Sequence, residues 1–140
     1  MTRTSNPVPR SVPPVNRLAV IAAGGVLGSL ARFGLSLALV DAGRGGWPMA
    51  TFLANVVGCL LIGIVASSPL VGRGPHWLRP FAITGVLGGF TTFSAFALET
   101  GVLLDSGRVL LALSYAAGTM VTGLLAVRLG VVIAGREGLS

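Results

Sequence analysis

The sequence has 140 residues, of which 53% are hydrophobic and only 10% are charged. A mean hydropathy of +0.87 excludes a soluble globular domain, because so few polar side chains could not keep its surface in water. The formal net charge of +6 could indicate nucleic-acid binding, but most of the arginines flank apolar runs, where arginine sets topology and anchors the chain at head groups. The composition therefore predicts an integral membrane protein with no nucleic-acid partner.

The first residues differ from the rest of the chain in composition. Residues 1–17 contain four prolines and three arginines, and they have too few apolar side chains to fold. The apolar stretch that follows continues to residue 40, which is too long for the hydrophobic region of a secretory signal. We therefore predict a flexible, basic, Pro-rich tail over residues 1–17, followed by a segment that stays in the membrane.

Four apolar runs are long enough to cross the hydrocarbon core, which takes roughly 20 helical residues. They cover residues 18–40, 47–68, 78–104 and 109–134. The connections between them are short and rich in Gly and Pro, so consecutive helices should be antiparallel neighbours. The predicted fold is an all-α membrane protein with one four-helix transmembrane domain over residues 18–134 and a short C-terminal tail over residues 135–140.

Positive charge is distributed unevenly over the two sides of these spans. With four spans, both termini and the second loop share one side. The arginines on that side are Arg3, Arg10, Arg17, Arg73, Arg79, Arg128 and Arg136, whereas the other side has only Arg44 and Arg108. The positive-inside rule therefore predicts that both termini are cytoplasmic if the orientation is fixed.

Four short helices enclose little interior. The sequence contains 21 glycines, and Gly24/Gly28 and Gly85/Gly89 have the spacing that lets helix backbones approach closely. A water-lined path is hard to fit through one such bundle. We therefore expect a pore at a subunit interface, and hence a dimer.

Thr51 and Asn55 form a polar stripe in the second run, because residues at i and i+4 lie on one helix face. One interpretation is that Asn55 makes an interhelical hydrogen bond that holds helices together. The other is that the carboxamide N–H and the hydroxyl donate to a dehydrated anion. The pair alone does not decide between them.

The third run combines Gly88-Gly89 with Thr91-Thr92 near mid-membrane, where all four residues have low helix propensity. We predict a break in this helix. Unwound backbone at that depth must be buried in protein or line a cavity, and its freed carbonyls offer a site for a hard cation. The alternative is a straight helix in which the threonines bond to their own backbone.

Phe93 and Phe96 are three residues apart and so lie near one another on a helix surface. Paired phenylalanines in a membrane helix usually face lipid or pack in a core. However, the edge of an aromatic ring carries partial positive charge. Beside Ser94 and Asn55, such edges could face a small anion without binding it too tightly to leave.

The first run contains one charged side chain, Arg32, and the third contains Glu99 in addition to Arg79 at its start. Arg32 is close enough to the end of its run to extend to the interface, or it could line a vestibule. Glu99 is the only acid within a span, and we expect it to form an ion pair or a hydrogen-bonded carboxyl at the subunit interface.

Three motifs on these spans resemble the Fluc/CrcB family of fluoride channels. They are residues 24–33 (GGVLGSLARF), residues 51–58 (TFLANVVG) and residues 85–96 (GVLGGFTTFSAF), the last followed by Glu99. The resemblance extends over residues 18–134, and the third motif is the most specific.

The resemblance implies an antiparallel dual-topology dimer with two pores and a structural Na⁺ at its centre, held by the main-chain oxygens of Gly88 and Thr91. Fluoride would pass Asn55 and the edges of Phe93 and Phe96 from different subunits. The resemblance also implies a polar track on the fourth helix, where Tyr115 and Thr119 fit but the next position is Gly123, so the track is incomplete unless Ser114 or Thr122 substitutes. The implied fluoride pathway comprises Asn55, Phe93, Phe96, Thr51, Ser94, Tyr115 and Thr119, with Arg32 and Glu99 as vestibule or structural charges.

The implied function is a fluoride-selective channel in the cell membrane that lets cytoplasmic fluoride leave passively and so lowers its toxicity. We expect no enzymatic activity, because the sequence has no nucleophile–base pair, metal-ligand cluster or phosphate loop. One alternative is a small four-helix proton-coupled drug exporter. Such exporters resemble one another in carrying a Glu in the first helix, and residues 18–40 contain no acid.

Two forms of the dimer remain open. A homodimer inserted in both orientations needs nearly balanced flanking charge, whereas the arginines here are unbalanced. The chain could therefore pair with a homologous subunit of opposite topology, either as a conducting or as a non-conducting partner.

Overall fold

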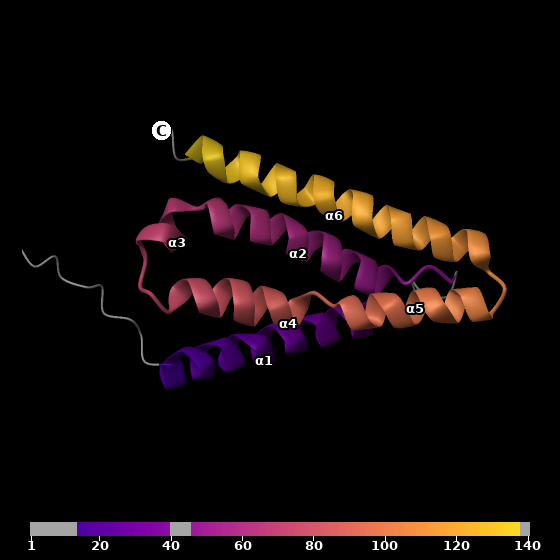
Figure 1. Ribbon diagram of the computed structural model, residues 1–140, viewed down its shortest axis with the longest axis horizontal. Coiled ribbons are helices and arrows are strands. Elements are labelled where there is room, and N and C mark those ends of the chain that lie inside the picture. The colour runs from indigo at the N-terminus through magenta and orange to yellow at the C-terminus, as the bar shows by residue number, and fades with distance from the viewer. Residues whose placement is uncertain (1–13, 40–45, 138–140) are drawn as a thin grey trace, which may run out of the picture.

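The computed structural model describes residues 14–39 and 46–137, and their regular structure is entirely helical (Figure 1). Four stretches are long and apolar enough to cross a membrane: Asn16–Ala38, Met49–Ser67, Pro80–Asp105 and Val109–Gly135. The predictions of an all-α chain and of four membrane spans are confirmed.

The helix boundaries differ from the predicted ones by a few residues. Helix α1 covers Pro14–Ala38 and so starts inside the predicted tail, because proline is well suited to the first turn of a helix. Helix α6 covers Val109–Glu137 and continues past residue 134. The rest of the predicted N-terminal tail, residues 1–13, lies outside the described residues.

The second span is a single helix, α2 (Met49–Ser67), followed by the short helix α3 (Pro69–Arg73). The third span consists of three pieces: the π-helix η2 (Pro80–Leu87), α4 (Gly88–Phe90) and α5 (Phe93–Asp105). The residues between α4 and α5, Thr91 and Thr92, are extended, with φ/ψ of −79°/154° and −148°/122°. We call them the 91–92 linker.

The four spans pack as two close pairs. Helix α1 lies along η2 and α4, and α2 lies along α6 (Figure 1). Glycine permits the first contact, because a Cβ added to Gly24 would lie 2.6 Å from the Phe81 carbonyl oxygen and 2.9 Å from the Gly85 Cα. Such close approach lets the backbones gain dispersion energy, since lipid tails leave little hydrophobic driving force between helices.

A small core lies where α5 meets α6. Phe96, Leu103, Ala112 and Tyr115 are buried there. Many large apolar side chains elsewhere are exposed, such as Leu110, which is 83% exposed. This distribution suits a chain whose outer surface is solvated by lipid.

Candidate functional site

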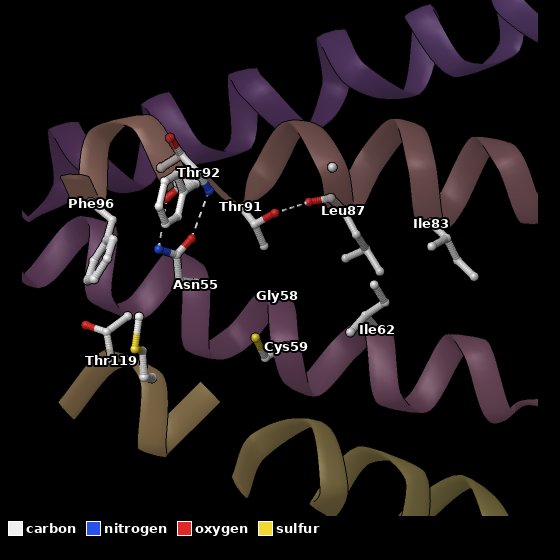
Figure 2. A pocket seen from close by; sticks show the side chains of 13 residues that line it. Asn55, Gly58, Cys59, Ile62, Ile83, Leu87, Thr91, Thr92, Phe96 and Thr119 are labelled. Atoms are coloured by element: carbon white, nitrogen blue, oxygen red, sulfur yellow. Dashed lines mark hydrogen bonds between the residues drawn. The ribbon is translucent and has the colours of Figure 1, made fainter. Parts of the chain in front are cut away.

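Asn55 on α2 ties the second span to the 91–92 linker. Its Nδ2 donates to the carbonyl oxygen of Thr92 at 3.0 Å, and the Thr92 backbone N–H donates to its Oδ1 at 2.8 Å (Figure 2). The side chain thus pairs with an extended residue as a neighbouring strand would. A carboxamide nitrogen has two N–H groups, so one of them remains for another acceptor.

The threonine hydroxyls of the linker complete the two helix ends. Thr91 Oγ1 donates to the Leu87 carbonyl oxygen at 2.9 Å, and Thr92 Oγ1 accepts from the Ala95 N–H at 3.2 Å. Thr92 is therefore the N-cap of α5. The capping preference of threonine explains locally why α5 starts at Phe93.

These bonds release two backbone carbonyls from the helical pattern. In an uninterrupted helix, the N–H of Thr92 would donate to the Gly88 oxygen and that of Ala95 to the Thr91 oxygen. Here the first donates to Asn55 and the second to the Thr92 hydroxyl. The carbonyls of Gly88 and Thr91 can therefore accept another donor or a hard cation. Within residues 14–39 and 46–137 there is no group of three or more His, Cys, Asp or Glu side chains that could hold a metal ion.

Helix α1 contacts the same region through the carbonyl of Gly89. Arg32 Nε donates to this oxygen at 3.3 Å, and Ser29 Oγ approaches it at 3.5 Å. Arg32 is therefore directed at the backbone beside the linker, not only along its own helix.

Glu99 on α5 joins three helices through hydroxyl groups. Thr51 Oγ1 of α2 donates to Oε1 at 2.7 Å, and the Tyr115 OH of α6 donates to Oε2 at 2.7 Å. Glu99 was expected to form an ion pair or a hydrogen-bonded carboxyl, and within the single chain it forms the second; its expected place at a subunit interface stays a prediction. Thr51 and Asn55 both act as interhelical hydrogen-bonding groups, the first of the two interpretations given above.

The two phenylalanines of α5 have different environments. Phe93 is 76% exposed, whereas Phe96 is 8% exposed. Their ring centroids are 5.9 Å apart, and the Phe96 ring also lies 5.4 Å from that of Tyr115. One ring is therefore fixed by packing, and the other projects from the surface of the subunit.

Two cavities have residues of the third span in their walls, and the first of them includes the linker. The first has a volume of about 370 Å³, and its wall contains no charged side chain (Figure 2). It is lined by Asn55, Gly58, Cys59, Ile62, Ile83, Leu87, Gly88, Thr91, Thr92, Phe93, Phe96, Thr119 and Met120. We call it the neutral cavity.

The second cavity has a volume of about 340 Å³, and its wall contains two charged residues, Arg32 and Glu99. It is lined by Ser29, Arg32, Phe33, Ser36, Ala50, Thr51, Ala95 and Glu99. We call it the charged cavity. The structure thus brings Asn55, Phe93, Phe96 and Thr119 together in one cavity, and it places Thr51 with Arg32 and Glu99 in the other.

The remaining hydroxyls predicted for the pathway have intramolecular contacts. Thr119 Oγ1 donates to the Tyr115 carbonyl oxygen at 2.8 Å. The exposed Ser94 Oγ lies 3.2 Å from Thr92 Oγ1. Gly123, where the polar track on the fourth helix lacks a hydroxyl, is buried against Cys59.

Two residues contribute to the site although they were not among the predicted site residues. Thr92 accepts and donates at the centre of the linker, and Ser29 shares the Gly89 carbonyl with Arg32. The role of Thr92 could have been predicted from the sequence, because threonine is a common N-cap residue and this one directly precedes residues 93–96. Ser29 could have been predicted as well, because it lies three residues before Arg32 and thus on the same helix face.

A comparison with known protein families finds one that this chain matches over most of its length. Residues 19–131 match the family model described as CrcB-like protein, Camphor Resistance (CrcB). The match includes the 91–92 linker, both cavities and all four spans except their outer ends.

Several individual proteins are similar over most of their length. A fluoride-specific ion channel FluC from Paracoccus denitrificans is 46% identical over 115 residues, which cover 81% of this chain and 90% of that protein. FluC 2 from Nocardia farcinica is also 46% identical, over 87% of this chain and 89% of its own. FluC from Thermus thermophilus is 43% identical over 83% and 91%.

Proposed function

Because the chain belongs to the CrcB-like family, we propose that it is the pore-forming subunit of a fluoride-selective channel. Its relatives are named fluoride-specific ion channels, and its four spans make it a multi-pass membrane protein. In the proposed function the chain catalyses no covalent step, and fluoride moves passively down its electrochemical gradient.

The observation that carries this proposal is the neutral cavity. Fluoride is small and strongly hydrated, so a selective path has to replace its water with closely spaced donors, whereas a formal positive charge would hold it too tightly to conduct. The wall contains Asn55, whose second N–H is available to an anion, and two phenylalanine rings, whose edges carry partial positive charge; it contains no charged side chain. In our proposal fluoride passes Asn55, Phe93 and Phe96.

The other predicted hydroxyls have a supporting role in this proposal. Thr51 and Tyr115 are bonded to Glu99, and Thr119 is bonded to its own helix. A hydroxyl can rotate to donate to a passing anion when its present acceptor is released. We propose that Thr51, Ser94, Tyr115 and Thr119 extend the pathway beyond Asn55 and that Arg32 attracts fluoride to the charged cavity.

We propose further that the 91–92 linker is a functional break and that the freed oxygens of Gly88 and Thr91 hold a structural Na⁺. Carbonyl oxygens suit a hard monovalent cation, and these two have lost their helical donors to Asn55 and Thr92. Bound Na⁺ would offset the partial negative charge of these carbonyl oxygens at mid-membrane. If it binds, replacing Na⁺ by N-methylglucamine will lower the unfolding temperature of the purified protein, and an unchanged temperature contradicts the site.

The proposal includes an antiparallel dimer with the cation at its centre. Gly88, Phe93 and Ser94 are exposed on the single chain, and a polar backbone group facing hydrocarbon is costly. A second subunit would cover them and bring a further pair of rings to each path. The unbalanced arginines favour one fixed orientation with cytoplasmic termini and hence a homologous partner of opposite topology, although a homodimer meets the same geometry.

In the cell membrane, such a channel would let fluoride that accumulates in the cytoplasm leave the cell. Neutral HF crosses lipid and dissociates inside, and the anion then needs a path outward. The direction follows from the gradient alone, so expression of the chain in fluoride-sensitive cells should raise the tolerated fluoride concentration.

The test is efflux from proteoliposomes recorded with a fluoride electrode. Vesicles with the competent dimer, formed by the purified chain alone or with a homologous subunit, should release fluoride but not chloride. Asn55→Ala should slow release by about tenfold to a hundredfold, because a donor to a charged group is lost. Thr100→Ala is the matched control, since this hydroxyl donates to its own helix at Phe96 and lies outside both cavities. Equal release of fluoride and chloride would contradict the proposed selectivity.

The partner is tested in the same assay. If the chain alone releases no fluoride and co-reconstitution with a homologous subunit restores release, the heterodimer is supported. Release by the chain alone would refute the need for a second kind of subunit.

A further inference from the structure

A third cavity lies at the end of the bundle where α1 begins. It has a volume of about 540 Å³ and is lined by Asn16, Ala19, Val20, Pro75, His76 and Trp77. The first three belong to the first two turns of α1, and the others to the connection between α3 and η2. These segments meet at the same end of the molecule as the end of α6 (Figure 1). We call this cavity the terminal groove.

The groove has an apolar part and a polar part. Ala19, Val20 and Pro75 provide carbon surface, while Asn16 and His76 provide hydrogen-bonding side chains. Trp77 is 48% exposed and packs edge-on against Phe81 at 6.1 Å, so its ring is held at the groove. Half-exposed tryptophan at the end of a span is typical of the membrane–water interface.

Three arginines lie close in sequence to the residues that line the groove, although none of the three is part of its wall. Arg17 follows Asn16, and Arg73 and Arg79 stand on either side of the segment 75–77 in the chain; all three are exposed. The sequence has only four acidic residues. Glu99 lies at mid-span and Asp105 at the far end of α5, while Asp41 follows α1 in the sequence. Only Glu137, the last residue of α6, belongs to the end that carries the groove.

This combination matches one class of ligand, an amphiphile with an anionic head. We propose that the terminal groove binds an anionic phospholipid, with the phosphate facing Arg17, Arg73 and Arg79 and the start of an acyl chain on Ala19 and Val20. Basic pockets between membrane helices recognise lipid head groups in this manner. Phosphatidylglycerol is the probe, because it has an anionic phosphate head and acyl chains. Its binding is proposed independently of whether the chain conducts fluoride.

Native mass spectrometry of the purified full chain tests the proposal. The protein is mixed with equal amounts of dioleoyl phosphatidylglycerol and dioleoyl phosphatidylcholine, and retained lipid is counted. The wild-type protein should retain the anionic lipid preferentially. Each arginine near an anionic head contributes about a fivefold preference, so Arg73→Gln combined with Arg79→Gln should reduce it by about thirtyfold.

Arg128→Gln is the matched control, because it removes the same charge from an exposed position on α6, which contributes no residue to the groove. This variant should keep the wild-type preference. Equal retention of both lipids by the wild-type protein, or an equal loss in Arg128→Gln and in the double variant, would overturn the proposal.

A second variant keeps the test valid if the double variant does not fold. Ala19→Phe fills the apolar part without changing charge, and it should reduce retention of phosphatidylglycerol while size-exclusion elution stays at the wild-type volume. Unchanged retention in this variant would overturn the proposal. So would displacement of the lipid by an equal concentration of glycerol 3-phosphate, because the acyl contacts would then contribute nothing.

Discussion

The neutral cavity and the charged cavity lie on either side of the third span and use polar groups in opposite ways. In the charged cavity, the carboxyl group of Glu99 is held by Thr51 and Tyr115, and the Arg32 guanidinium donates to the Gly89 carbonyl. In the neutral cavity, Asn55 uses one amide N–H for the backbone and keeps one. The charged side chains thus make hydrogen bonds between helices, whereas Asn55 has an uncharged N–H that is not needed for its bond to the backbone.

The largest effect is expected for Asn55→Asp, which makes the neutral cavity resemble the charged one. The carboxylate cannot donate to the Thr92 carbonyl and places negative charge where an anion would bind. We expect fluoride efflux to fall by about a hundredfold or more, since hydrogen bonds to charged groups contribute about 1.5–3 kcal/mol and repulsion is added. Efflux rates from proteoliposomes measure this, and a rate within twofold of wild type would remove Asn55 from the pathway.

The next largest effect distinguishes a phenylalanine ring that contacts fluoride from one that only packs against its neighbours. Phe93→Leu changes an exposed side chain, so the unfolding temperature of the isolated subunit should barely change while fluoride efflux falls about fivefold, if an aromatic edge contributes about 1 kcal/mol. Phe96→Leu should lower both quantities, because Phe96 is buried against Tyr115. Thermal unfolding in detergent and flux are measured side by side. Normal flux with Phe93→Leu would mean that this ring only packs.

A smaller effect is expected in the charged cavity. Glu99→Gln retains one acceptor oxygen but cannot accept from both Thr51 and Tyr115, so one buried hydroxyl loses its partner at a cost of about 1–3 kcal/mol. Tyr115→Phe removes one of these donors. The double variant should be less destabilised than the sum of the two single variants, which a double-mutant cycle by thermal unfolding checks. Additive losses would show that the carboxyl and the phenol are not coupled.

The smallest effect is expected for Thr91→Val, which keeps the shape of the side chain and removes its bond to the Leu87 carbonyl. The cost should be about 1 kcal/mol in stability, with efflux unchanged, because the proposed ion ligand at Thr91 is the backbone oxygen. A large loss of flux would assign the hydroxyl itself to the pathway.

The sequence predicts the spans well and the contacts between them poorly. Run length and hydropathy are local properties, so the four helices follow directly from residues 18–134. The pairing of Asn55 with Thr92 joins residues 37 apart, and that of Thr51 with Glu99 joins residues 48 apart. Both depend on the register of α2 against the third span, which no local pattern fixes.

Some local features were also missed. The π-helical winding of Pro80–Leu87 has no distinctive sequence pattern, because its residues would equally form an α-helix. The division of the polar residues between two cavities could not be foreseen either. Thr51 and Asn55 share a helix face, yet they bond to points seven residues apart on the third span, which the linker extends.

The linker also changes the electrostatics of the membrane interior. An unbroken span would keep both poles of its macrodipole at the bilayer surfaces, where water screens them. Interruption at residues 91 and 92 puts the partial negative pole of η2–α4 and the partial positive pole of α5 next to each other at mid-depth. One end of the gap thereby favours a cation and the other an anion, so that ions of opposite sign could occupy neighbouring positions without any ionised side chain between them.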